Sequence, residues 1–155
     1  MNQKRQARGF SLVELVIVVV IVGLLAAIAI PRFSRGAAGA SDSALSGDLA
    51  VLRNAIELYA AEHNGSFPDE DSIADQLTLY SNLAGATSAT PGDTHPFGPY
   101  LHAVPALKVG TQAGGNLIEG VNATPTAETA TANTGWLYNE ATGQIWANET
   151  ELLDR

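Results

Sequence analysis

An apolar run from Leu15 to Ile30 constrains this chain more than any other feature. It begins one residue after Glu14 and contains no charged side chain. Residues 10–30, 21 in number, would span about 31 Å as an α-helix, the thickness of a bilayer's hydrocarbon core. The preceding leader, residues 1–9, has no acid and three basic residues, a bias that favours its retention on the cytoplasmic side: Lys4, Arg5 and Arg8. The sequence therefore predicts a transmembrane helix over residues 10–30.

A secretory signal peptide is the alternative interpretation of this segment. Ala27-Ile28-Ala29 fits the A-x-A cleavage pattern at the end of an apolar run. The carboxylate of Glu14 argues against a discarded peptide, because inserting it into the membrane costs about 1–3 kcal/mol. The apolar run also continues without a break into a long helical pattern. We therefore expect the segment to be retained in the mature protein.

The residues around the start of the apolar run resemble a known processing signal. The run Gly9-Phe10-Ser11-Leu12-Val13-Glu14-Leu15, followed by an apolar helix and Pro31, closely resembles the class III signal of type IV pilins and type II secretion pseudopilins. The resemblance implies that a membrane-embedded prepilin peptidase cleaves between Gly9 and Phe10 and methylates the new amino terminus of Phe10. It also implies that Glu14 meets the amino terminus of an adjacent subunit during filament assembly. At 4 Å and an effective dielectric of 20, this pair would attract by about 4 kcal/mol. The alternative is that Glu14 only reaches the lipid headgroups or pairs with the amino terminus of its own chain.

Beyond Pro31 the helical pattern becomes amphipathic. One face carries apolar residues at steps of three and four: Leu45, Leu49, Leu52, Ile56 and Tyr59. Asn64-Gly65 supplies a left-handed cap, so the helix should end near His63. Pro31 removes a backbone hydrogen bond and should bend the helix where it leaves the membrane.

The predicted fold is α+β and pilin-like: a long N-terminal helix whose second half packs on a small antiparallel β-sheet. Its parts are a leader over residues 1–9, a transmembrane helix over residues 10–30 and an exported domain over residues 31–155. Within that domain we expect a short helix over residues 70–82 and two short strands over residues 100–104 and 107–109. An exposed excursion over residues 110–134 and a C-terminal hairpin over residues 135–147 should follow.

Charge and cysteine content exclude some classes of protein. The leader holds three of the eight basic residues and none of the 16 acids, which leaves a net charge of −11 after its removal. Nucleic-acid binding is not expected, because it depends on Lys and Arg neutralising phosphates. The chain has no cysteine, so an exported domain must hold together without a disulfide.

The sequence offers no pattern typical of a catalytic or metal centre. His63, His95 and His102 lack metal-ligand spacing, and each is predicted to be a surface or loop residue. The acids at 69, 70, 71 and 75 are interpreted as charge that complements the helix dipole on a solvated face. The major pseudopilins carry a calcium loop, but the nearest equivalent, His95-Pro96-Phe97-Gly98, has no acid. We expect neither a cofactor nor a metal, and calcium is possible but unsupported. The aromatic residues Trp136 and Trp146 could form a ligand platform, although core packing is the favoured interpretation.

The resemblance implies a structural function. The chain is expected to be a subunit of a type II secretion pseudopilus or a related type IV pilus-like filament that drives protein export across the outer membrane, and not an enzyme. Its expected partners are the prepilin peptidase, other subunits, a membrane assembly platform and the bacterial inner membrane, with the C-terminal domain in the periplasm. The alternatives are a true type IV pilin for adhesion, motility or DNA uptake, and a membrane-tethered binding domain that never polymerises.

Overall fold

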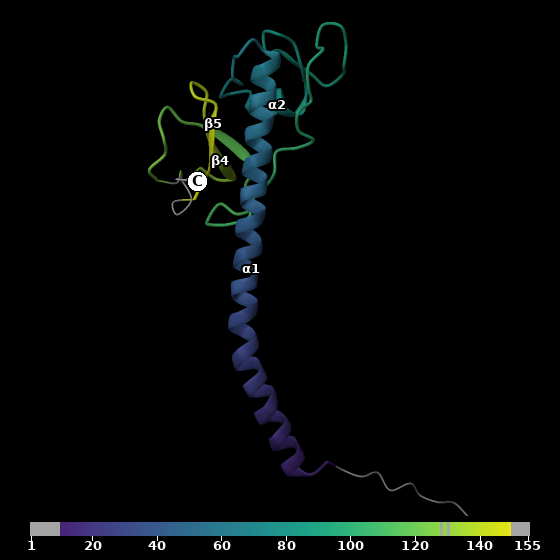
Figure 1. The fold of residues 1–155 in the computed structure, drawn as a ribbon, viewed down its shortest axis with the longest axis vertical. Helices are drawn as coiled ribbons and strands as arrows, with labels where there is room; N and C mark the ends of the chain where they lie inside the picture. The colour runs from purple at the N-terminus through teal and green to yellow at the C-terminus, as the bar shows by residue number, and fades with distance from the viewer. Residues whose placement is uncertain (1–9, 128, 130, 150–155) are drawn as a thin grey trace, which may run out of the picture. The chain divides into compact units, whose positions relative to one another are not determined.

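The structure is a computed structural model that describes the chain from Phe10 to Glu149 except residues 128 and 130, with backbone but no side chains for residues 30–38. The chain divides into two compact units, Met1–Ala40 and Ser41–Arg155. They are called the N-terminal unit and the C-terminal unit below. Within the described residues the chain forms one long helix, one short helix and then five strands, several of which are labelled in Figure 1. This arrangement confirms the predicted α+β class.

The long helix α1, Leu12–Glu62, ends where its sequence predicts. Asn64 and Gly65 both have left-handed backbone conformations, with φ of 58° and 85°. The Gly65 N–H donates to the Ala60 carbonyl at 2.8 Å, a bond that closes the helix end. Pro31 lies inside α1, because the helix continues through it. The bend predicted at Pro31 remains a prediction.

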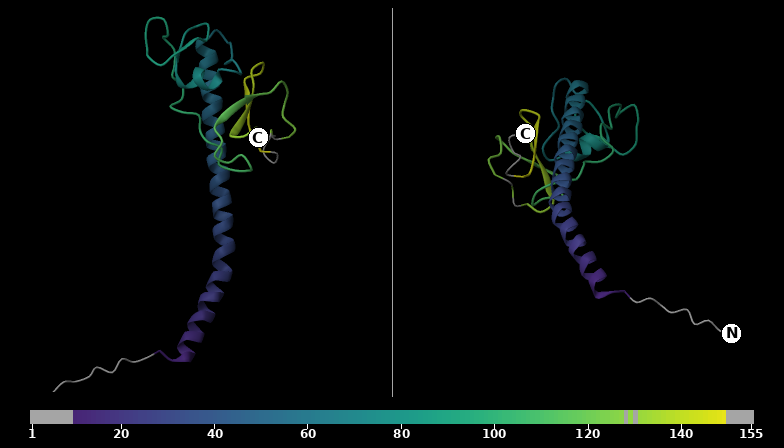
Figure 2. Two further views of the ribbon diagram at one scale, coloured as in Figure 1. Left: turned by 180° about the vertical axis from the view of Figure 1, so that it is seen from behind. Right: turned by 60° about the horizontal axis from the view of Figure 1, so that its bottom comes forward.

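The core of the C-terminal unit forms between α1 and a β-hairpin. Strands β4, Thr134–Asn139, and β5, Gln144–Ala147, pair antiparallel beside the C-terminal part of α1 (Figures 1 and 2). The apolar face predicted for α1 is buried here, and the hairpin contributes large side chains to the same core: Trp136, Tyr138 and Ile145. The predicted hairpin and the predicted helix face are both confirmed.

The two tryptophans of the hairpin do not form a common platform. Trp136 pairs across the hairpin with Ala147, whereas Trp146 pairs with Leu137. Because neighbouring residues of a strand point to opposite faces, Trp136 and Trp146 lie on opposite faces of the sheet. Both are buried, as is Leu137. The prediction of core packing is confirmed, and the alternative of an aromatic ligand platform is wrong.

The third strand of this sheet lies in the segment predicted to be an exposed excursion. β3, Leu117–Gly120, pairs parallel with β4, which gives the order β3-β4-β5 and a mixed sheet in place of a purely antiparallel one. No strand forms over residues 100–109, contrary to the prediction. Leu101 and Leu107 are buried there, but their N–H groups donate to Leu77 and Gly115 outside any strand ladder.

The short helix is shorter than predicted. α2, Ile73–Thr78, has six residues, and Tyr80, which lies within the range predicted to be helical, begins a strand instead. That strand, β1, Tyr80–Ser81, pairs antiparallel with β2, Thr87–Ser88. The carboxylate of Asp69 accepts the N–H of Asp71 at 3.0 Å just before α2, and such local bonds compete with helix formation.

Two consecutive residues after β5 hold the segment 110–134 against the rest of the C-terminal unit. The fully buried Asn148 accepts the Thr129 N–H at 2.8 Å and donates to the Thr134 carbonyl at 2.8 Å. The Glu149 carboxylate accepts the Thr111 N–H at 3.0 Å. We call this pair of residues the polar clasp. It ties both ends of the segment to β5 in a chain that has no cysteine.

Replacing Asn148 with aspartate should destabilise the C-terminal unit. Asn148→Asp puts a carboxylate oxygen against the Thr134 carbonyl in place of a donor, at an expected cost of about 2–4 kcal/mol in the free energy of unfolding. Urea unfolding of residues 37–155 measures this cost. The same substitution at the exposed Asn122 is the control and should cost less than about 0.5 kcal/mol. Equal stability of the two variants would contradict the clasp.

Candidate functional site

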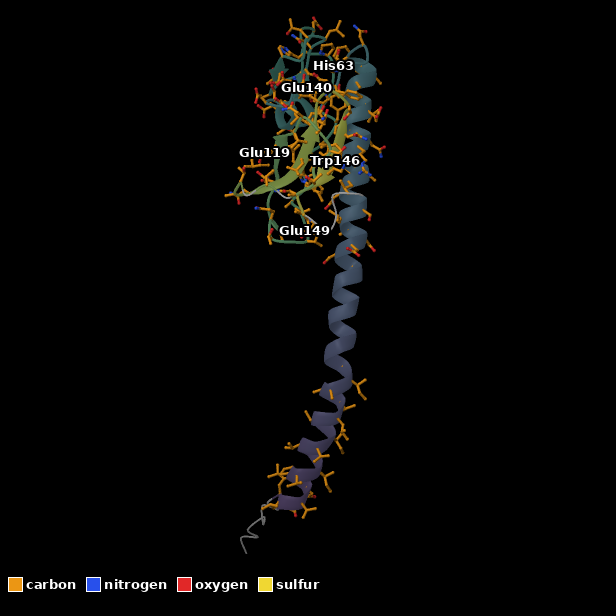
Figure 3. The ribbon with its side chains drawn as sticks, turned by 90° about the vertical axis from the view of Figure 1, so that its left-hand side faces the viewer. His63, Glu119, Glu140, Trp146 and Glu149 are labelled. Atoms are coloured by element: carbon orange, nitrogen blue, oxygen red, sulfur yellow. The ribbon has the colours of Figure 1, made fainter. Side chains whose placement is uncertain are left out.

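The N-terminal unit exposes a continuous apolar helix. Residues Leu12–Ala29 are long and apolar enough to cross a membrane, and none of that stretch is buried within the protein. Figure 3 shows the side chains of this stretch projecting from the helix. Exposed apolar patches of this size are rare on soluble proteins, because water makes them unfavourable. The segment therefore requires an apolar environment that its own chain does not provide.

Glu14 is the one ionisable residue within this stretch, and it folds back onto the start of the helix. Its Oε2 accepts the Ser11 N–H at 2.8 Å. In turn, the Ser11 hydroxyl oxygen accepts the Val13 N–H at 3.3 Å. The Ser11 carbonyl accepts the Leu15 N–H at 3.2 Å, which identifies Ser11 as the N-cap residue. The capping role of Ser11 was not predicted from the sequence, although Ser11-Leu12-Val13-Glu14 fits the S-x-x-E capping pattern.

The predicted cleavage junction lies just before this cap. Gly9 and the rest of the leader are outside the described residues. Phe10 precedes the helix, and 84% of its side chain is exposed. Phe10 therefore lies outside α1, where helix hydrogen bonds do not hold its backbone. The cleavage itself and the methylation of Phe10 remain predictions.

His63, predicted to be a surface or loop residue, lies in the turn that follows α1, but its side chain is buried and not on the surface. Its ring stacks on that of Tyr59, with centroids 3.7 Å apart. Its Nδ1 lies 2.8 Å from the Tyr59 carbonyl oxygen, and its Nε2 lies 3.1 Å from the Ser81 hydroxyl. Both ring nitrogens have protein partners, so His63 joins α1 to β1 and is not placed to hold a metal. His95 and His102 lie in loops, as predicted.

Three tyrosines in the same core have perturbed acidities. Burial raises the pKa of Tyr138, whose hydroxyl donates to the Pro68 carbonyl at 2.9 Å. Burial also raises the pKa of Tyr100, and the Glu62 carboxylate that accepts its hydroxyl at 2.6 Å adds to the shift. For Tyr59 the pKa is raised by burial and by the charge of Asp69. All three phenols are structural groups that stay protonated at neutral pH.

The acids before and within α2 form no metal site. Across the described part of the chain, no three His, Asp or Glu side chains are grouped so that they could hold a metal ion. Asp69 instead accepts the Ser72 hydroxyl at 3.2 Å. No side chain caps α2 by a hydrogen bond, and among these four acids Asp75 lies in its first turn, where a negative charge complements the helix dipole.

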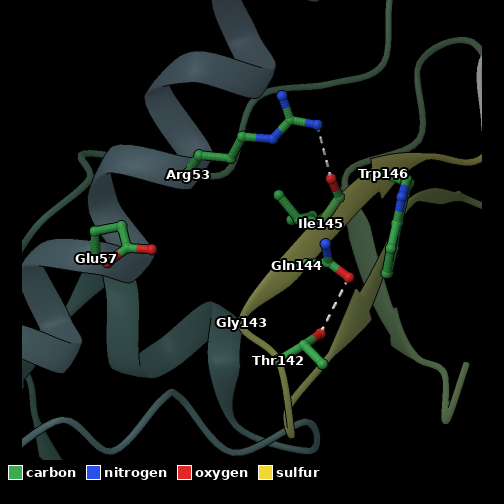
Figure 4. A pocket seen from close by; sticks show the side chains of 7 residues that line it. All are labelled: Arg53, Glu57, Thr142, Gly143, Gln144, Ile145 and Trp146. Carbon is green, nitrogen blue, oxygen red and sulfur yellow. Dashed lines mark hydrogen bonds between the residues drawn. The ribbon is translucent and has the colours of Figure 1, made fainter. Parts of the chain in front are cut away.

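A surface cavity of about 360 Å³ lies between α1 and the turn that joins β4 to β5. Arg53 extends across it and donates to the Ile145 carbonyl at 3.3 Å (Figure 4). This bond covers part of the free edge of β5. The other lining side chains include Glu57, Thr142 and Gln144, with no nucleophile and base in contact among them. Beside this cavity the Arg53 bond joins α1 to β5.

Comparison with known proteins finds a family match near the N-terminus. Residues 4–30 match the family described as "Prokaryotic N-terminal methylation motif". The chain is 35% identical to the type II secretion system core protein G of Pseudomonas aeruginosa over 116 residues, which span 68% of this chain and 80% of that protein. No solved structure matches the chain significantly.

Two further relatives are similar over a shorter length. The core protein G of Aeromonas hydrophila is 32% identical over 75 residues, 48% of this chain and 52% of that protein. The type IV major fimbrial protein FimA of Dichelobacter nodosus is 38% identical over 86 residues, 56% of this chain and 51% of that protein. The chain thus spans about half the length of each of these two relatives.

Calcium should have little effect on the stability of the C-terminal unit. A site filled at a hundredfold excess over its Kd would add about 2.7 kcal/mol. Because the described acids form no such site, the melting temperature of residues 37–155 should change by less than about 2 °C between calcium and a chelator. Differential scanning calorimetry measures this, with magnesium at equal ionic strength as the control. A calcium-specific rise of about 5 °C or more would contradict the prediction.

Proposed function

The chain belongs to the family of type IV pilins and type II secretion pseudopilins, and on this premise we propose that it is a structural subunit of a type II secretion pseudopilus or a related filament. The observation that carries the proposal is the apolar helix Leu12–Ala29, none of which is buried, with a single carboxylate, Glu14, at its start. This subunit acts by assembly and not by catalysis, and it uses no cofactor.

The exposed helix suits two environments in turn. Before assembly, lipid covers it, and afterwards the same helices of other subunits cover it. Both surroundings are apolar, so transfer from lipid to the filament changes the hydrophobic free energy little. Packing and polar contacts between helices therefore decide whether the subunit joins the filament. An unpaired carboxylate gains the most free energy from this transfer, because burying its charge in lipid is costly and an ammonium group of another subunit stabilises it. Glu14 would therefore set the axial position of each subunit as it enters the filament.

The C-terminal unit suits the outer part of such a filament. Its apolar helix face is buried by its own sheet, so it folds without help from neighbouring subunits. We propose that it lies in the periplasm, that the helix lies in the inner membrane before assembly, and that a prepilin peptidase and a membrane assembly platform act on the chain.

Similarity supports a secretion filament first and a pilus second. The alignment with the core protein G of Pseudomonas aeruginosa spans 80% of that protein, and this coverage favours a role in protein export across the outer membrane. The 38% identity to the fimbrial protein FimA favours the second candidate, a true type IV pilin. Loss of the gene should abolish export of secreted proteins in the first case, and surface pili in the second. A monomer that never polymerises would be inconsistent with both.

Cleavage is expected between Gly9 and Phe10. Both the basic leader and this junction lie at the cytoplasmic end of the helix, on the side where the prepilin peptidase acts. Mass spectrometry of the mature chain should find an N-methylated Phe10 as its first residue. A mature terminus near Ile30, after the A-x-A pattern, would identify the segment as a secretory signal peptide and contradict the filament proposal.

Glu14→Ala should prevent assembly while leaving membrane insertion and cleavage largely intact. The loss of an attraction of about 4 kcal/mol should lower filament yield by at least tenfold, as counted by electron microscopy of sheared cell-surface material. Asp93→Ala, which removes an exposed loop carboxylate, is the matched control and should assemble normally. Normal filaments and normal export from Glu14→Ala cells would show that charge pairing is not the mechanism.

A further inference from the structure

The side chains of Ser11 and Glu14 accept backbone N–H groups at the start of α1. Glu14 accepts the Ser11 N–H at 2.8 Å, and the Ser11 hydroxyl oxygen accepts the Val13 N–H at 3.3 Å. With Ser11 as N-cap, Glu14 occupies the third helical position. This reciprocal arrangement is a capping box, except that the hydroxyl bonds the second helical N–H instead of the third.

A capping box has unusual value at this place in the chain. The first N–H groups of any helix lack partners within the helix. In a soluble protein water can bind them, but beside the hydrocarbon core of a membrane it cannot, and each unsatisfied group is then costly. Ser11 and Glu14 together satisfy two of these groups from within the chain itself.

The box also sets the direction of the Glu14 side chain. Its carboxylate is held back over the N-terminal end of the helix, next to Ser11 and therefore next to Phe10 in sequence. A carboxylate has two oxygens and about four acceptor sites. The bond from the Ser11 N–H uses one of them, so the group keeps acceptor capacity for a second donor.

We propose that Ser11 is a positioning residue: with Glu14 it forms a capping box that fixes the start of the membrane helix at Leu12 and holds the carboxylate toward the amino terminus that cleavage creates. The part of this inference that concerns assembly rests on the proposed function. Glu14 then has two separable roles, as a hydrogen-bond acceptor for its own helix and as a charge for the filament.

Four substitutions separate these roles. Ser11→Ala removes the hydroxyl and keeps the charge of Glu14, whereas Ser11→Thr keeps a hydroxyl. Glu14→Gln keeps an acceptor that a capping box can use and removes the charge, whereas Glu14→Ala removes both. Ser46→Ala is the matched control, because Ser46 is an exposed serine in the same helix whose hydroxyl donates to the Asp42 carbonyl.

Amide hydrogen exchange of the full chain in detergent micelles tests the box without any filament. Ser11→Ala should speed exchange of the Val13 N–H about fivefold, and Ser11→Thr should restore it to within about twofold of the wild type. Glu14→Ala should speed exchange at Ser11, while Glu14→Gln and Ser46→Ala should not. Unchanged exchange at Val13 in Ser11→Ala would overturn the capping box.

Filament yield tests the second half of the inference. Ser11→Ala should lower the yield at least about threefold although the charge of Glu14 is intact, and Ser11→Thr should restore it. Faster exchange with a normal yield would overturn the positioning role in assembly. If the wild-type chain forms no filaments, the proposed function fails instead, and amide exchange alone decides whether the capping box exists.

Discussion

The burial of one face of α1 against the β4-β5 hairpin is the interaction on which the C-terminal unit depends. Leu45, Leu52 and Ile56 have no exposed surface, and the same holds for Trp136 and Tyr138 opposite them. Burying each such side chain contributes about 1.5–3 kcal/mol. Because the chain has no disulfide, this core and the polar clasp must hold the unit together. This face of the helix is therefore buried within the subunit and is not available to neighbouring subunits.

The N-terminal unit has the opposite character, and this contrast explains how the chain can work. Its apolar side chains find no partner within the described part of the protein, and Leu12–Ala29 has no buried portion. A unit that satisfies its own apolar surface and a unit that cannot do so are joined by one continuous helix, Leu12–Glu62. Lipid and then neighbouring helices can therefore bind the N-terminal unit without unfolding the C-terminal unit.

Strong local patterns made part of this structure predictable. The helix face, the Asn64-Gly65 cap and the hairpin each follow from periodicity or turn chemistry within a few residues. β3 was missed because its burial is weak: Leu117 is 52% exposed, so the strand shows no apolar alternation. The burial of His63 depends on Ser81 and Phe97, which are distant in sequence. At the candidate site, the prepilin-like motif was enough to predict Phe10 and Glu14 as functional residues. The role of Ser11 followed only from its hydrogen bonds with Val13 and Glu14 in the structure.

We propose that Glu14 joins subunits through the amino terminus that processing creates. A helical reconstruction by cryo-electron microscopy of filaments built from this chain tests it most directly, because it locates both groups. We expect the Glu14 carboxylate to lie within about 4 Å of the Phe10 nitrogen of an adjacent subunit. A carboxylate that contacts lipid, solvent or only the start of its own helix, in filaments of normal length, would contradict it.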